Sequence, residues 1–320
     1  QRQMCIRDRP QSCEEMIDDM RYRWVKVNPY KGNGIGRIIS MFSFVTKLYC
    51  NYRRYLRNFK PDIVIASSTY PLDIYPAYRI ARHYHAKLIY EVHDLWPLSP
   101  MELGGYSKKH PFIRIMQKAE DDCYRYADAV VSMLPKAEEH MREHGLTRDK
   151  FHYVPNGIVL SDWNNPKGIP EEHGLLLSKL RAEGKFIVGF AGAHGIANSL
   201  YAVIDAVSSL TEQNVVLVLV GGGQEKENLI KYAHKKGVTN VYFLLPINKL
   251  AIPNLLKEMD VLYIGLQKQS LFRFGISPNK MFDYMMAAKP IIQAIDAGNN
   301  LVREADCGID VEPVSYTHLR

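Results

Sequence analysis

The sequence contains few cysteines, and none of them forms a closely spaced pair. All five stand singly, and no CxxC pair occurs. This pattern fits neither a zinc ribbon nor a disulfide framework and favours a reducing compartment, so we expect a cytoplasmic protein. Long apolar runs are also lacking, because stretches such as 215–220 are far shorter than the roughly 20 residues that a membrane-spanning helix needs.

Several functional motifs are missing as well. The glycine-rich stretch 221–223 is not a GxGxxG fingerprint followed by an acidic residue, which argues against a nicotinamide-dependent dehydrogenase. Carboxylate and histidine side chains do not recur at the spacing of metal ligands, so we predict no metal site. The chain also has no short repeat and no low-complexity tract.

The length and composition are those of a globular protein with two hydrophobic cores. The chain has 320 residues, of which 47% are hydrophobic and 23% charged. Its net charge of +7 is concentrated in residues 1–60, which hold 13 Lys and Arg against 5 Asp and Glu. The remainder is close to neutral and offers no basic stripe, so we expect no nucleic-acid partner.

Within the basic region, residues 36–60 predict an amphipathic helix. Apolar side chains recur there at helical spacing, and arginines cluster toward the end. One interpretation is a core helix with a solvated basic end. The alternative is a helix that lies on an anionic membrane surface. The apolar positions are Ile38, Phe42, Val45, Tyr49, Tyr52 and Leu56, and the arginines are Arg53, Arg54 and Arg57.

Short β-branched runs alternate with helical stretches along most of the chain, which is typical of parallel strands joined by helical crossovers. We predict an α/β fold of two Rossmann-like, doubly wound domains that face each other across a cleft. The predicted strands are Ile63–Ala66, Leu88–Val92, Val130–Met133, Phe151–Val154, Phe186–Ala191, Val215–Val220, Val241–Leu245, Val261–Ile264 and Ile291–Ala294.

The expected domain limits follow from the interruptions of this pattern. We expect an N-terminal domain over 22–158, a connection over 159–184 that is rich in Asn, Gly and Pro, and a C-terminal domain over 185–312. The ends 1–9 and 314–320 do not continue the neighbouring hydrophobic pattern. We interpret them as non-native, adapter-derived sequence, and the chain as a fragment that is incomplete at both domain ends.

The turn after the predicted strand 186–191 is a candidate phosphate site. Gly192 and Gly195 free the backbone there, and a helix follows from Asn198. Unpaired N–H groups and the helix dipole favour an anion at such a turn. The alternative is a tight strand-to-helix turn without a ligand, in which His194 is a solvated loop residue.

A second candidate lies at 277–283. Ser277 suits a helix N-cap and Pro278 the first helical position, which places Lys280 and Asp283 one turn apart. The two residues form either a surface salt bridge or a binding pair, in which Lys280 faces a phosphate and Asp283 accepts hydrogen bonds from a ribose diol. Asn279 is also a neighbour of Asp283 on this helix.

In the N-terminal half, "LIYEVHDLWPLSP" (88–100) ends a strand with His93 and Asp94. A histidine suits a binding cleft because its charge changes near neutral pH and its ring both donates and accepts hydrogen bonds. The alternative for His93 is a structural role at the strand end.

Together these residues resemble the family 4 retaining glycosyltransferases of the GT-B fold, in particular the branch that builds bacterial surface polysaccharides. The resemblance covers about residues 22–312. It is carried by "EVHDLWP", "VPNGI" (154–158), "GFAGAHGIANSL" (189–200), "LVLVGGGQEKENL" (217–229), "VYFLLPI" (241–247) and "FGISPNKMFDYMMAAKPII" (274–292).

The resemblance implies a donor site held mostly by the C-terminal domain. The turn Gly192, Ala193, His194, Gly195 and Asn198 would bind the diphosphate, and Leu245, Pro246 and Ile247 the nucleobase through backbone groups. Asp283 would bind the ribose, while Ser277, Asn279 and Lys280 would add donor contacts. His93, from the opposite domain, would meet the transferred sugar, so that His93 and Asp283 are the implied catalytic residues.

Two features depart from the family pattern. The first glutamate of its paired-glutamate motif would fall near Phe272 and is absent, while Asp283 stands at the second. The basic pair commonly found in the phosphate turn is also missing. Phosphate affinity would therefore depend on backbone N–H groups and Lys280.

The implied reaction transfers a sugar from a nucleotide-diphosphate donor, UDP-linked, to a hydroxyl acceptor with retention, in cell-surface polysaccharide biosynthesis. The acceptor would be a glycan or a lipid-linked molecule, and neither cofactor nor metal is implied. Contact with the inner membrane face stays open. The alternatives are a UDP-sugar 2-epimerase of the same fold and a two-domain sugar-binding protein.

Overall fold

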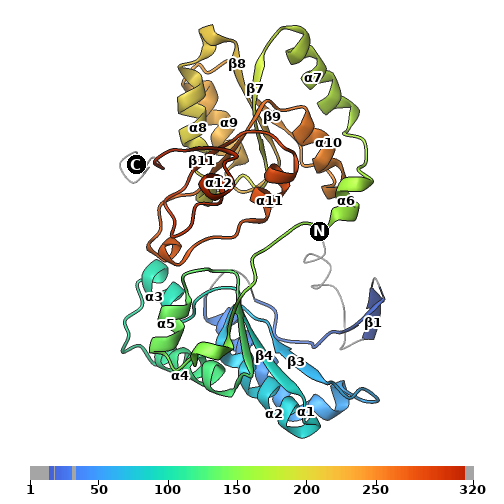
Figure 1. Ribbon diagram of the computed structural model, residues 1–320, viewed down its shortest axis with the longest axis vertical. Coiled ribbons are helices and arrows are strands. Elements are labelled where there is room, and N and C mark those ends of the chain that lie inside the picture. The colour runs from blue at the N-terminus through green and yellow to red at the C-terminus, as the bar shows by residue number, and fades with distance from the viewer. Residues whose placement is uncertain (1–13, 18, 31–33, 314–320) are drawn as a thin grey trace. The chain divides into compact units, whose positions relative to one another are not determined.

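The computed structural model describes residues 14–17, 19–30 and 34–313, and its chain divides into two compact units (Figure 1). The N-terminal unit comprises residues 1–133 and 137–154, and the C-terminal unit comprises 134–136 and 155–320. The segments 1–9 and 314–320, which we interpreted as non-native, lie outside the described residues. Each unit is described by itself.

The N-terminal unit is built on a parallel sheet with the strand order β3-β4-β5-β6. Its strands are β3 (Ile63–Ala66), β4 (Lys87–Val92), β5 (Ala129–Ser132) and β6 (Phe151–Tyr153), which match the predicted strands to within one residue at each end. An antiparallel pair, β1 (Glu14–Ile17) and β2 (Met20–Arg23), was not predicted. The helices are α1 (Ile35–Tyr55), α2 (Ile74–Tyr84), α3 (Leu98–Gly104), α4 (Pro111–Tyr126) and α5 (Glu138–Glu143), with short 3-10 turns η2 (Pro71–Asp73) and η3 (Arg148–Lys150).

Helix α1 forms where the sequence predicts it, and it buries Val45 and Tyr52 but not the whole predicted apolar face. Met41 and Val45 pack with Leu72, Met116 and Ala119 in the core of the unit. Phe42 and Tyr49, which the spacing assigned to the buried face, remain exposed. The periodicity alone could not select the face, because apolar residues surround most of this helix.

The C-terminal unit contains a six-stranded sheet, all parallel, with the order β12-β11-β10-β7-β8-β9. Its strands are β7 (Phe186–Ala191), β8 (Val215–Val220), β9 (Val241–Leu244), β10 (Val261–Gly265), β11 (Ile291–Ala294) and β12 (Gly308–Asp310). Its helices are α6 (Leu160–Asn164), α7 (Glu171–Ala182), α8 (Leu200–Ser208), α9 (Lys226–Lys235), α10 (Ile252–Lys257), α11 (Asn279–Met286) and α12 (Leu301–Glu304). Its 3-10 turns are η4 (Ile196–Asn198), η5 (Thr211–Gln213), η6 (Lys249–Ala251) and η7 (Ser270–Phe274).

Helices cover both faces of this sheet, as a doubly wound fold requires (Figure 1). Along β8, Val216, Val218 and Val220 face the core that α7, α10 and α11 complete. Leu217 and Leu219 face the opposite core, which contains side chains of α8 and α9. A strand buried on both faces reads as a continuous apolar run, which explains why β8 carries no polar residue.

The segment 159–184, expected as a connection, differs from that expectation. It contains α6 and α7, and Leu177 and Leu180 of α7 lie in the core of the C-terminal unit with about 1% of their surface exposed. The Asn, Gly and Pro residues that suggested a connection occupy the loop between these two helices and the approach to α6.

Candidate donor site

The strand order of the C-terminal sheet fixes where a ligand would bind. The chain runs outward from β7 to β8 and β9 on one side, then returns to β10 on the other side of β7. Such a reversal opens a crevice at the carboxyl ends of the two central strands. The loops that follow β7 and β10 meet there, since the N–H of Gln267 donates to the carbonyl of Ala197 at 2.9 Å.

The turn after β7 is held by the glycine-rich loop after β8. The N–H of His194 donates to the carbonyl of Gly222 at 2.8 Å, and the carbonyl of His194 accepts from the N–H of Glu225 at 3.0 Å. The N–H of Gly192 extends the strand pairing to Val220. The N–H of Asn198 donates to the carbonyl of Gly195 at 3.1 Å, so three of the five amides that the sequence assigned to a diphosphate are already used within the fold.

The N–H groups of Ala193 and Gly195 remain for a ligand. Within the described ranges 14–17, 19–30 and 34–313, no backbone carbonyl and no side chain accepts a hydrogen bond from them. They precede η4 and helix α8, whose first turn adds the positive end of a helix dipole. This turn is thus suited to an anion, although with fewer free amides than expected.

His194 does not present its side chain to a ligand. The ring is fully buried, 0% exposed, and lies near the rings of Phe190 and Phe243. Burial, together with the charges of Lys226 and Lys280, lowers the pKa of His194 to about 4. The ring is therefore neutral at physiological pH and adds no positive charge to the turn, contrary to a solvated loop histidine.

Lys280 is the lysine that reaches the turn after β7. Its Nζ hydrogen-bonds Oδ1 of Asn198 in the phosphate turn and lies 4.6 Å from the ring centroid of Phe190. Its stem passes Gly192, where an added Cβ would be 3.5 Å from Cε. Burial lowers the pKa of Lys280 to about 8. The surface salt bridge to Asp283 that we considered does not form, because Lys280 turns toward the loop after β7.

Ser277 does not cap helix α11. The helix begins at Asn279 with Pro278 as its N-cap residue, and no side chain caps it. The Ser277 hydroxyl instead accepts the N–H of Asn156 at 2.8 Å, and the Asn156 side chain donates to the Ser277 carbonyl. This exchange joins the segment 154–158 to the start of α11, a long-range contact that local helix signals do not contain.

Asp283, one turn after Lys280, lines a cavity of about 190 Å³. Its Oδ1 accepts a hydrogen bond from Nε1 of Trp163 at 3.2 Å, and the carboxyl group is half-buried. Burial raises its pKa, while the Trp163 hydrogen bond and the charge of Lys249 counteract that effect. The second carboxylate oxygen has no hydrogen-bond partner among the described residues and is available to a ligand in the cavity.

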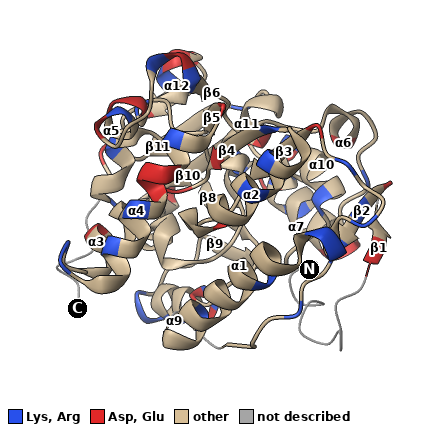
Figure 2. Cartoon of the chain, turned by 90° about the horizontal axis from the view of Figure 1, so that it is seen from below, with Lys and Arg blue, Asp and Glu red and all other residues tan. Residues whose placement is uncertain are grey.

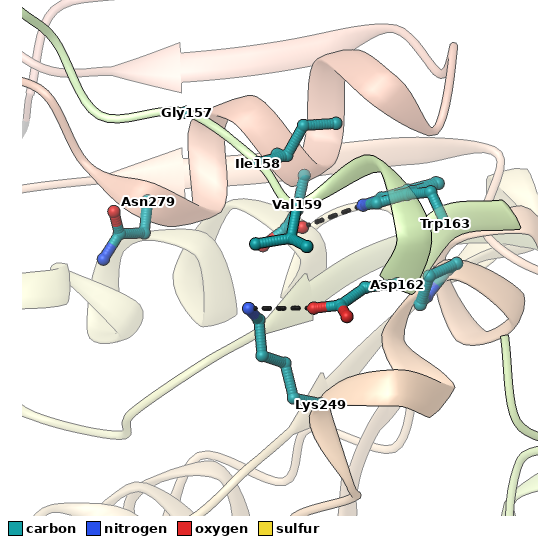
Figure 3. A pocket seen from close by; sticks show the side chains of 9 residues that line it. Gly157, Ile158, Val159, Asp162, Trp163, Lys249 and Asn279 are labelled. Carbon is teal, nitrogen blue, oxygen red and sulfur yellow. Dashed lines mark hydrogen bonds and ion pairs between the residues drawn. The ribbon is translucent and has the colours of Figure 1, made fainter. Parts of the chain in front are cut away.

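The other walls of this cavity were missed by the sequence analysis. Asp162 and Trp163 come from α6, and Lys249, which also lines the cavity, pairs with Asp162 at 3.1 Å (Figure 3). Asn279, a predicted donor contact, also lines the cavity. A tryptophan between acidic and amide residues at 162–165 was the available signal, but we assigned that segment to the domain connection.

Leu245, Pro246 and Ile247 follow β9, next to the glycine-rich loop. An added Cβ on Gly222 would lie 3.2 Å from Cγ of Pro246. The Leu245 carbonyl contacts Nε2 of His173 at 2.9 Å, while the Leu245 side chain is 59% exposed. The three residues lie at the same edge of the sheet as the phosphate turn, and their contact with a nucleobase stays a prediction.

His93 belongs to the N-terminal unit, directly after β4. Its Nε2 lies 2.9 Å from Oγ of Ser67 and 3.4 Å from a carboxylate oxygen of Glu91. Asp73, buried below the same loops, has its pKa raised to about 6 by burial, and the charge of His93 acts in the opposite direction. The structure therefore places the Ser67 hydroxyl and the Glu91 carboxylate next to the His93 ring.

Two family profiles match the chain, one in each half. Residues 2–157 match the glycosyl transferase 4-like domain, and residues 177–316 match the glycosyl transferases group 1 domain. The two domains in this order, on a doubly wound fold, define a GT-B glycosyltransferase. The chain belongs to the family 4 glycosyltransferases.

A putative teichuronic acid biosynthesis glycosyltransferase of Bacillus subtilis is 24% identical over 215 residues, which are 64% of this chain and 50% of the relative. The chain thus spans about half the length of this curated relative. Among solved structures, Anabaena HepE in complex with UDP-glucose has a TM-score of 0.56 at 17% identity, with 90% of this chain and 72% of that one covered. Sucrose-phosphate synthase of Thermosynechococcus elongatus has a TM-score of 0.65 at 14% identity, with 98% and 75% covered.

No helix in the described part of the chain has the length and apolar character needed to cross a membrane.

Proposed function

We propose that this protein transfers a sugar from a UDP-linked donor to a hydroxyl group of a glycan or lipid-linked acceptor, with retention of anomeric configuration, in the synthesis of a cell-surface polysaccharide. The observation that carries the proposal is the arrangement of α11. Lys280 reaches the turn after β7, while Asp283 lines the cavity one turn further on. A nucleoside diphosphate carries an anionic diphosphate, which matches Lys280, and next to it a ribose diol, which matches Asp283.

In this assignment the diphosphate binds the N–H groups of Ala193 and Gly195 and the ammonium group of Lys280. The Asp283 carboxylate accepts hydrogen bonds from the ribose hydroxyls. During transfer, the bond between the anomeric carbon and the diphosphate breaks and negative charge develops on the leaving oxygen. Lys280 and the start of α8 are fixed where that charge develops, so they stabilise the transition state more than the ground state.

The acceptor oxygen attacks from the face that the diphosphate leaves, and its proton passes to the departing phosphate oxygen. The configuration is therefore retained. His93 is proposed to position the transferred sugar, and its contacts with Ser67 and Glu91 restrain the ring. The proposal requires no metal at the donor site, because Lys280 and the backbone N–H groups supply the positive charge there.

The ribose assignment is tested by Asp283→Asn. Loss of a charge-assisted hydrogen bond of roughly 1.5 to 3 kcal/mol should weaken binding of UDP and of UMP by about 10- to 100-fold. Pyrophosphate, which has no ribose, should bind as before. Isothermal titration of the three compounds measures this. Asp205→Asn on α8, where the carboxylate pairs with Lys236, is the matched control, and equal UMP affinity in both variants would refute the assignment.

The reaction class is tested by product analysis. A transferase consumes the UDP-sugar rapidly only when an acceptor is present, whereas a 2-epimerase converts it without one. A sugar-binding protein would bind the free sugar and not UDP. Release of UDP that depends on acceptor supports the proposal, and epimerised UDP-sugar in its absence contradicts it.

We also propose that α1 lies against an anionic membrane surface, which would bring the enzyme to a lipid-linked acceptor. The helix carries Lys and Arg but no Asp or Glu (Figure 2). Ile35, Ile39, Phe42 and Tyr49 recur along one exposed side, at 75%, 49%, 36% and 40% exposure. These are the two components of interfacial binding, apolar side chains and positive charge.

Vesicle sedimentation measures this contact. The protein should bind vesicles that contain anionic lipid, and binding should weaken with salt. The variant Ile39→Ser/Phe42→Ser should bind several-fold less at unchanged melting temperature, because both side chains are exposed. Equal binding of the variant and the parent protein would exclude α1 as the membrane contact.

A further inference from the structure

The N-terminal unit contains a cluster of three potential metal ligands that is separate from the donor site. Glu120 lies on α4, while His140 and His144 lie on and directly after α5, and side-chain contacts bring the three residues together. One ligand atom of each residue lies within 4.8 Å of the others. His140 and His144 are four positions apart, so their rings share one side of the helix. Two imidazoles and one carboxylate form a ligand set typical of Zn²⁺.

One distance within the cluster is close to that of a tetrahedral site. Nε2 of His140 and Oε1 of Glu120 are 3.4 Å apart. Two ligands at roughly 2.0 to 2.1 Å from a zinc ion and at the tetrahedral angle are about 3.3 Å apart. This pair would therefore need little movement to hold an ion.

Burial and charge also favour a cation. Glu120 is 1% exposed and accepts hydrogen bonds from Tyr124 at 2.9 Å and from Gln117 at 2.8 Å. Within the described part of the chain, no lysine or arginine forms an ion pair with this carboxylate, and Nε2 of His140 approaches it at 3.4 Å. A buried carboxylate is costly without a compensating charge, and a divalent ion supplies one.

Neighbouring side chains hold the His144 ring in place. Its Nδ1 lies 3.0 Å from Oδ1 of Asp121 and 2.8 Å from Nε2 of Gln117. Metal-binding histidines commonly contact a carboxylate of this kind, which fixes the orientation of the ring. Both histidines also line a cavity of about 540 Å³, together with Glu143.

We propose that Glu120, His140 and His144 bind one Zn²⁺ ion, with the fourth coordination position open to this cavity. The alternative is a set of polar contacts between α4 and α5 that needs no ion. The local sequence His140-Met-Arg-Glu-His144 has the H-x-x-E-H spacing known from one class of zinc enzymes. In that comparison Glu143 lies beside the ion without being required as a ligand.

Metal content tests the proposal directly. Tag-free protein, loaded with ZnCl₂ and freed of excess by gel filtration, should retain one zinc per chain in elemental analysis. His140→Ala and His144→Gln should each lower the zinc affinity by at least about 100-fold in a titration against a chromogenic chelator. His152→Ala, which removes an exposed histidine of β6 in the same unit, should bind zinc like the parent protein.

Folding and geometry are checked on the same variants. Melting temperatures in EDTA should be similar for the parent and His144→Gln, while ZnCl₂ should raise only that of the parent and the His152→Ala control. Co²⁺ in place of Zn²⁺ should give the intense visible absorption of a tetrahedral site. The proposal is overturned if the parent retains no zinc, or if His140→Ala and His144→Gln retain as much zinc as the parent.

Discussion

Replacing Lys280 with methionine should lower kcat/KM for sugar transfer by at least about 100-fold without destabilising the protein. The methionine keeps most of the buried stem that passes Gly192, but it removes the charge next to the turn after β7. A preorganised donor to a developing anion typically contributes roughly 10²- to 10³-fold to the rate. UDP affinity should fall with it, whereas UMP affinity should fall less, because the charge is assigned to the diphosphate.

The pH dependence distinguishes this electrostatic role from a structural one. Burial lowers the pKa of Lys280 to about 8 from an ordinary value of 10.5. The UDP affinity of the parent protein should therefore decrease as the pH rises through about 8 and the ammonium group loses its proton. Bound diphosphate would shift this loss to higher pH. In Lys280→Met the affinity should be low and should lack this decrease.

The stability of Lys280→Met should not decrease, although its activity and UDP affinity should. Because the folded-state pKa is lowered, the unfolded chain binds more protons than the folded one between about pH 8 and 10.5. Charged Lys280 thus lowers the free energy of unfolding below pH 8, and this penalty disappears as the pH rises toward 10.5. The melting temperature of Lys280→Met at pH 7 should equal or exceed that of the parent. Lys257→Ala, an exposed lysine of α10, is the control and should retain full activity.

If Lys280→Met bound UDP as tightly as the parent protein at pH 7, the phosphate assignment would be wrong. A melting temperature well below that of the parent would instead indicate that the ammonium group supports the fold through Asn198.

Gly223→Ala should strongly destabilise the C-terminal unit. Gly223 has φ +154°, and a Cβ at this position would lie 2.4 Å from the carbonyl oxygen of His194. The contacting atoms belong to the backbone of the phosphate turn, so no side chain can move aside. We expect a loss of about 3 kcal/mol or more and a melting temperature lower by roughly 10 °C.

The close approach at Gly223 also links stability to donor binding. The same loop fixes His194 through the hydrogen bonds to Gly222 and Glu225, so any Gly223→Ala protein that folds should also bind UDP more weakly. Gly168→Ala is the control, because an added Cβ there meets nothing within 4 Å. Calorimetry measures both proteins, and equal melting temperatures would mean that the loops after β7 and β8 do not adopt this arrangement.

The strands of this fold could be predicted because their signal is local. β8 is covered by helices on both faces, so its residues 215–220 are apolar without interruption, and the predicted and observed limits agree. The same argument predicts a site in the loops that follow the strands. The reversal between β7 and β10 was not deduced from the sequence, because strand order depends on pairing between distant segments.

Several site residues could not be assigned correctly for the same reason. Serine is a favourable N-cap residue, but the Ser277 hydroxyl accepts a hydrogen bond from the Asn156 N–H, which lies in a distant segment. His194 reads as a loop residue, but the glycine-rich loop after β8 covers it. Trp163 reads as part of a connection, but α6 brings it to Asp283. In each case a long-range contact decides the role.

The proposed zinc ligands could not be recognised from their spacing in the sequence. His140 and His144 are close in the sequence, but their third partner, Glu120, lies on a different helix. We predicted no metal site from the sequence, because spacing along one segment does not show that Glu120 lies beside the two histidines. Packing of α4 against α5 completes the set.

The most direct test of the account is a crystal structure of the protein with bound UDP. The account predicts the diphosphate within hydrogen-bond distance of the Ala193 and Gly195 N–H groups and of Nζ of Lys280, and the ribose hydroxyls on the Asp283 carboxylate. UDP bound away from the crevice between β7 and β10, or with its ribose remote from Asp283, would contradict it.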